Sequence, residues 1–117
     1  MAMKEVERIT LTELEQMAET GDGLVKADVD VSLHRLVVDM DLHADGEAYL
    51  LERGSRQQDI WGINLYPNKY GTDEFIEYDS MINMRPRQGN RSRDVLDQAV
   101  RAKIAEIVHA AICREDR

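Results

Sequence analysis

The residues best suited to chemistry form an arginine-rich stretch late in the chain. Residues 85–93, which we call the arginine loop, contain Arg85, Arg87, Arg91 and Arg93 and no carboxylate. Guanidinium groups bind phosphate and carboxylate through paired hydrogen bonds, and the loop leads into a predicted helix whose N-terminal amides also favour anions. We therefore predict that Arg85, Asn90, Arg91 and Arg93 bind an anion. A structural loop whose arginines pair with the chain's own carboxylates fits slightly better.

Acidic residues form a second pattern, at alternate positions of two predicted strands. Asp28 and Asp30 lie in the first run, and Asp39 and Asp41 lie in the second. Because alternate residues of a strand share a face, these carboxylates would crowd together, with Asp28 opposite Asp39 in a hairpin. Clustered carboxylates suit Mg²⁺ or Ca²⁺, but no recognised metal loop is present. We favour a solvated acidic face and expect no metal and no cofactor.

His43 and Asp79 are the candidates for acid–base catalysis. His43 opens the sequence His-Ala-Asp-Gly-Glu, which spaces three metal-ligating residue types at every second position. Asp45 and Gly46 resemble a helix start, which would turn Glu47 away, so an N-cap is the favoured interpretation. His43 could act as a general base, although no nucleophile lies at a recognisable spacing.

Hydrophobic periodicity predicts the elements that would position these groups. Amphipathic stripes predict helices over residues 10–18, with a capping box, and from 95 or 98 to 113. A candidate N-cap at Asp45 and a stop at Gly54 predict a helix over residues 45–54. Alternation predicts strands over residues 25–31, 36–42, 59–66 and 75–85. We expect an α+β fold with a mostly antiparallel four-stranded sheet in the order αββαββα and helices on one face. The uncovered polar face would then carry Asn64, Asp79 and Asn83.

Length and composition limit the class of protein. The chain has 117 residues, 43% of them hydrophobic and 32% charged, which fits one globular domain over residues 1–117. A net charge of −8 argues against general nucleic-acid binding. No apolar run approaches the roughly 18 residues of a membrane span, and the N-terminus lacks a signal-peptide core. The single cysteine, Cys113, excludes an internal disulfide. We expect a cytoplasmic protein with neither membrane nor nucleic acid as partner.

Several strings of the sequence together suggest a family. They are Val-Lys-Ala-Asp-Val-Asp from Val25, Leu-His-Ala-Asp from Leu42, Trp-Gly-Ile-Asn-Leu-Tyr-Pro from Trp61 and Asp-Ser-Met-Ile-Asn-Met-Arg-Pro from Asp79, followed by Gln-Gly-Asn-Arg-Ser-Arg from Gln88. Over about residues 24–113 the chain resembles a family of small prokaryotic proteins catalogued as a domain of unknown function. The resemblance implies a stand-alone prokaryotic domain and supplies no catalytic residue.

Two functions from different classes remain open. The first is a small non-enzymatic binding or interaction protein that uses the polar sheet face and the arginine loop to hold a small anionic ligand or a protein, and a homo-oligomer is compatible with it. The alternative is a hydrolase acting on a phosphorylated or nucleotide substrate, in which the arginines hold the anion and His43 or Asp79 transfers protons. An enzyme requires these groups to surround one pocket.

Overall fold

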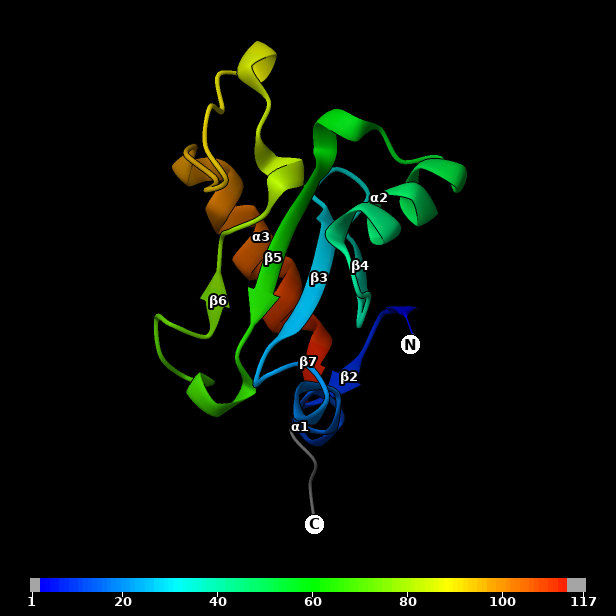
Figure 1. Ribbon diagram of the computed structural model, residues 1–117, viewed down its shortest axis with the longest axis vertical. Helices are drawn as coiled ribbons and strands as arrows, with labels where there is room; N and C mark the ends of the chain where they lie inside the picture. The colour runs from blue at the N-terminus through cyan, green and yellow to red at the C-terminus, as the bar shows by residue number, and fades with distance from the viewer. Residues whose placement is uncertain (1–2, 114–117) are drawn as a thin grey trace.

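A five-stranded antiparallel sheet forms the centre of the fold. The computed structural model describes residues 3–113 (Figure 1). The strands are β1 (Lys4–Val6), β3 (Val25–Asp30), β4 (Arg35–Val38), β5 (Ile60–Leu65) and β6 (Ile76–Glu77), in the order β1-β4-β3-β5-β6. The α+β class and the mostly antiparallel sheet are confirmed, whereas the expected four-stranded αββαββα order is not. The extra strand, β1, pairs antiparallel with β4 at one edge.

Helices cover both faces of the sheet, so the expectation of helices on one face was wrong. The helices are α1 (Leu11–Glu19), α2 (His43–Glu52) and α3 (Gln98–Ala111). The main core joins α1 and α3 to the first sheet face, whereas α2 lies on the opposite face (Figure 1). A second, smaller core on that face joins Leu50 of α2 to Val37 and Ile60. Val37 and Ile60 are apolar residues on the sheet face whose other residues are mostly polar. They give α2 an apolar surface to pack on.

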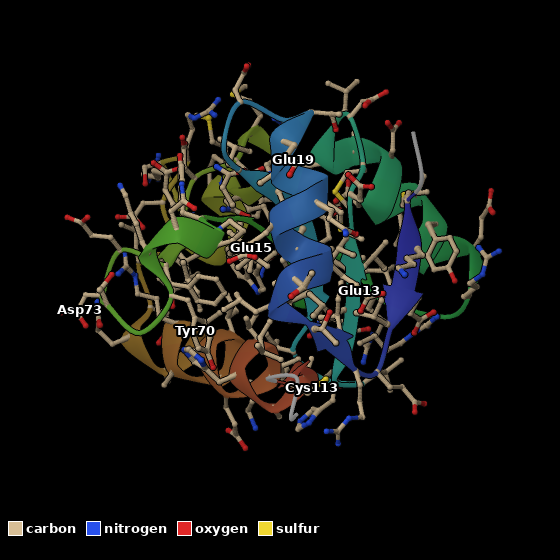
Figure 2. All side chains as sticks on the ribbon, turned by 90° about the horizontal axis from the view of Figure 1, so that it is seen from below. Glu13, Glu15, Glu19, Tyr70, Asp73 and Cys113 are labelled. Carbon is tan, nitrogen blue, oxygen red and sulfur yellow. The ribbon has the colours of Figure 1, made fainter. Side chains whose placement is uncertain are left out.

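Two predicted helices agree closely with the structure. Thr10 and Glu13 form a reciprocal capping box at the start of α1, with the Thr10 side chain accepting the Glu13 amide at 3.0 Å. Figure 2 shows α1 from outside, with Glu13, Glu15 and Glu19 along it. Asp97 caps α3, whose residues Ile104 and Val108 are buried. A short parallel pair, β2 (Ile9–Thr10) and β7 (Ile112–Cys113), joins the start of α1 to the end of α3.

The hairpin register separates the acidic residues. Asp30 pairs with Arg35, so Asp28 lies opposite Val37 rather than opposite Asp39 as expected. Asp39 follows the strand with a left-handed φ of +73°, and its amide donates to the Lys26 carbonyl at 3.0 Å. The predicted crowding of four carboxylates on one face is therefore wrong.

The segment expected as a long strand over residues 75–85 contains only the two residues of β6. After β6 the chain forms two 3-10 helices, η3 (Met81–Asn83) and η4 (Pro86–Gln88). Two others, η1 (Gln57–Asp59) and η2 (Pro67–Lys69), flank β5. The Ser80 hydroxyl accepts the Ile82 amide at 3.2 Å, which stabilises a turn where alternation predicted extended chain.

Candidate functional site

Helix α2 divides the polar sheet face into a buried part and an open part. Asp28 and Asp30 have no exposed surface. Asp30 is fully engaged: one oxygen accepts the amides of Ser32 and Leu33, and the other accepts the Ser55 hydroxyl at 2.5 Å. The predicted N-cap at Asp45 is wrong, because α2 already begins at His43, after Leu42, which provides no side-chain cap. The extra helical residues extend α2 over the sheet.

Most of the predicted anion-binding groups are used inside the protein. Arg85 is buried, its guanidinium lies 4.4 Å from the Trp61 ring, and it donates to the carbonyls of Ile82 and Ile60. Burial lowers the pKa of Arg85 despite nearby carboxylates. The Asn90 amide holds the loop closed, donating to the carbonyls of Asn83 and Asp94 at 2.7 Å each. Arg85 therefore attaches the arginine loop to β5, and Asn90 closes the loop on neighbouring segments outside the sheet.

Three arginines remain at the surface of the loop, Arg87, Arg91 and Arg93. Arg93 forms an ion pair with Asp79, with Nε 2.6 Å from Oδ1, and both side chains are about half exposed. Arg91 is exposed. The interpretation of the arginine loop as structural expects its arginines to pair with carboxylates of the same chain, and the Arg93–Asp79 ion pair is such a contact. Anion binding by Arg91 stays a prediction.

His43, Asp79 and Arg93 converge where α2 begins. His43 is 9% exposed, and its Nε2 lies 2.8 Å from the Ile63 carbonyl, which only accepts, so Nε2 carries the hydrogen. Burial lowers the pKa of His43, the hydrogen bond to Ile63 opposes this, and the charges of Lys26 and Arg93, which lower the pKa, act against that of Asp79, which raises it. The imidazole is therefore neutral near pH 7, with Nδ1 as its basic atom.

A serine near this histidine does not complete a hydrolytic pair. A Cβ on Gly62 would lie 2.7 Å from Ser80 Oγ and 3.0 Å from His43 Cδ2, so both side chains lie over this glycine. Ser80 is 1% exposed and accepts the Ile82 amide, and no hydrogen bond joins it to His43 among the described residues. The geometry therefore differs from a nucleophile hydrogen-bonded to its base.

The open part of the face carries a row of polar residues across three strands. Lys26 pairs with Asn64, and Asn64 pairs with Glu77. Asn64 Nδ2 donates to Glu77 Oε1 at 2.9 Å, while Asn64 Oδ1 is buried without a partner in the part of the chain that the structure describes. Asn64 Nδ2 also lies 3.3 Å from the Asp79 carbonyl, so these two residues of the predicted polar face are neighbours. Asn83 instead is fully buried against Gly62.

The largest described cavity opens at the Lys26 end of this row. Its volume is about 460 Å³, and it is lined by Met17, Thr20, Gly21, Leu24, Val25, Lys26, Asp39, Met40 and Asp41. It lies where α1 ends, β3 begins and the chain runs from β4 into α2. Sequence reasoning assigned Asp39 and Asp41 to a sheet face and missed this cavity. The chain bend at Asp39, which brings them there, has no signature in the sequence.

The charges of this cavity are not paired with one another. Over residues 3–113, no ion pair includes Lys26, Asp39 or Asp41. The last turn of α1 contains no basic residue, so no side-chain cation opposes the partial negative charge of its C-terminus, although the amides of Gly21 and Gly23 donate to the Ala18 carbonyl. No group of three or more metal-ligating side chains within the described residues is placed to hold a metal ion. The cavity is thus a polar hollow with an excess of negative charge.

Comparison with known proteins leads to a family without an assigned activity. A family model described as protein of unknown function (DUF5674) matches residues 4–111. No curated protein and no solved structure matches the chain. The expected resemblance to a domain of unknown function is confirmed. Helices able to cross a membrane were not found among the described residues.

Proposed function

We propose that this chain, which belongs to the family of proteins of unknown function (DUF5674), is a non-enzymatic binding protein for a small ligand that carries an ammonium group. The ligand occupies the cavity beside Lys26, Asp39 and Asp41. The observation that carries the proposal is that these three charged side chains line a cavity of about 460 Å³ without pairing within the described chain. A cavity of that size accommodates a metabolite-sized molecule.

Electrostatics favour a cation over the anion that the sequence suggested. Two carboxylates outnumber the one lysine, and the C-terminus of α1 adds partial negative charge at Thr20 and Gly21. The whole chain has a net charge of −8, which attracts cations and repels anions. Met17 and Met40 offer apolar, polarisable surface to the carbon atoms around an ammonium nitrogen.

The test uses tetramethylammonium as the probe, because its charge does not titrate. We expect saturable shifts of amide resonances around the cavity on titration with tetramethylammonium chloride, and none with sodium acetate at equal ionic strength. Asp39→Asn and Asp41→Asn should each weaken binding by about fivefold, or about 1 kcal/mol. Asparagine tolerates the left-handed backbone at Asp39, so the first variant should keep the local fold.

A substitution at Lys26 best distinguishes cation binding from anion binding. Lys26→Gln should tighten binding of a cation because it removes a like charge, whereas it would weaken binding of an anion. Asp73→Asn, in an exposed loop away from the cavity (Figure 2), is the control and should leave the affinity unchanged. Weaker cation binding in Lys26→Gln, or shifts spread over the whole acidic surface, would contradict the proposal.

A second candidate function is hydrolysis of a phosphorylated substrate. It is favoured by the neutral His43 imidazole, which the Ile63 carbonyl orients and which lies near Asp79 and Arg93. This function requires Arg93 to leave its ion pair with Asp79 and bind the substrate phosphate instead. Turnover of p-nitrophenyl phosphate that is lost in His43→Asn and Arg93→Gln would support it. Equal background rates in all three proteins would exclude that substrate class.

A further inference from the structure

The Asp28 carboxyl is the least satisfied polar group in the described chain. It lies in the middle of β3, has no exposed surface, and neither oxygen accepts a well-formed hydrogen bond among the described residues, although the Glu47 backbone amide is near enough to lower its pKa. A buried carboxylate without partners is costly, so such a group retains its proton. Asp30, two residues along the same strand, is equally buried but fully hydrogen-bonded. Of these two buried carboxyls on β3, Asp28 is therefore the one that lacks partners.

Helix α2 packs directly onto this carboxyl. A Cβ on Gly46 would lie 2.3 Å from Asp28 Oδ2, a distance that real atoms do not adopt, so only glycine permits this approach. The stability of the α2 contact therefore depends on the charge that Asp28 carries.

The charged groups around Asp28 oppose its ionisation more than they support it. Burial raises the pKa of Asp28 well above its usual value, and Glu47 and Asp45 of α2 raise it further. Arg85 is the opposing cation, but its guanidinium is hydrogen-bonded to the Ile60 and Ile82 carbonyls. The cross-strand neighbours on β4 and β5, Val37 and Gly62, contribute no charge.

We propose that Asp28 is a proton-operated latch, which holds α2 against the sheet while the carboxyl is protonated and releases the helix when the proton leaves. The latch regulates the cavity through Met40, and this part rests on the proposed function. Met40 lines the cavity, and its Cε lies 2.7 Å from the Cβ position of Gly46. Movement of α2 therefore changes the cavity wall, and the segment from Asp39 to Asp41 leads directly into α2.

The direction of the pH dependence follows from which state binds the proton. The folded protein keeps the Asp28 proton to a higher pH than the unfolded chain does, because the folded pKa is raised. Stability therefore falls as pH rises from the usual carboxyl pKa through the folded one, and is level above it. Cation affinity should decline over the same upper range as α2 loosens.

The experiment compares the full chain with Asp28→Asn and with the control Asp73→Asn. Between about pH 5 and about pH 9, we expect the melting temperature of the native chain and the control to fall, and that of Asp28→Asn to change less. Carbon-13 titration of the native carboxyls should find one group with a strongly raised midpoint that is absent from Asp28→Asn. Hydrogen-exchange protection factors of α2 should drop above that midpoint.

Tetramethylammonium affinity separates the latch from the proposed function. Affinity that declines above the midpoint in the native chain but not in Asp28→Asn supports regulation of the cavity. Two results on the native chain alone would overturn the latch. One is an Asp28 titration midpoint in the usual carboxyl range, and the other is hydrogen-exchange protection of α2 that is equal below and above that midpoint. Absence of tetramethylammonium binding at every pH instead overturns the proposed function and leaves the latch to be judged on α2 exchange.

Discussion

At the residue scale, the Asn83 side chain forms the hydrogen bonds to β5 that a neighbouring strand would otherwise form. Its Oδ1 accepts the Gly62 amide at 2.9 Å, and its Nδ2 donates to the Gly62 carbonyl at 2.9 Å. The same Nδ2 lies 2.9 Å from the Arg93 carbonyl. One carboxamide thus joins β5 to the arginine loop and satisfies main-chain groups that β6, with two residues, is too short to reach.

We predict that Asn83→Ala destabilises the fold by about 3 kcal/mol, because it leaves the Gly62 amide and two carbonyls without partners in a buried place. Chemical denaturation measures the free energy of unfolding. Asn68→Ala, which removes the same carboxamide from an exposed turn, should cost less than about 0.5 kcal/mol. Similar small losses in both variants would mean that water replaces the Asn83 contacts.

Asn83 also shows where residue-level prediction failed. The sequence placed Asn64, Asp79 and Asn83 on one polar face because alternation continued through residue 85. Asn64 and Asp79 are neighbours, with Asn64 Nδ2 3.3 Å from the Asp79 carbonyl, but Asn83 turns inward within η3. Residue type alone does not distinguish an asparagine that faces solvent from one that replaces a backbone partner, because both suit a turn.

At the element scale, the sequence predicted the positions of α1, α2 and α3 along the chain but not the sheet face that α2 covers. The stripes of α1 and α3 match their buried residues. In α2 the buried residues include His43 and Gly46, and Leu50 is the large apolar one. A helix that docks through a glycine, a histidine and one leucine carries little amphipathic signal, so the sequence could not assign it to the second sheet face.

The packing of α3 gives the prediction at this scale. Ile104 is fully buried in the main core, so Ile104→Ala should cost on the order of 2–4 kcal/mol. The neighbouring Lys103 is exposed, and Lys103→Ala should change the free energy of unfolding by less than about 0.5 kcal/mol. A near-zero cost for Ile104→Ala would mean that α3 does not depend on this contact.

At the scale of the whole molecule, the fold places charge unevenly along an elongated body of 47 × 29 × 25 Å. Residues 1–80 have 7 basic and 18 acidic side chains, a net charge of −11, whereas residues 81–117 have 8 and 5, a net charge of +3. The arginine loop lies at the top in Figure 1 and α1 at the bottom, with Glu15 and Glu19 exposed. The cavity is therefore near the acidic end.

This distribution predicts how stability responds to salt. The acidic part of the chain repels itself, and the exposed ion pairs that salt would weaken are worth little individually. Raising NaCl from about 20 mM to about 150 mM should therefore raise the melting temperature by a few degrees, as the screening length shortens. Replacing NaCl by MgCl₂ at equal ionic strength should add nothing, because no described cluster is placed to hold a metal. A fall in melting temperature with NaCl would mean that ion pairs such as Glu5–Arg35 outweigh the repulsion. A rise in melting temperature that is specific to Mg²⁺ and is lost in Asp39→Asn would instead place a divalent cation in the cavity.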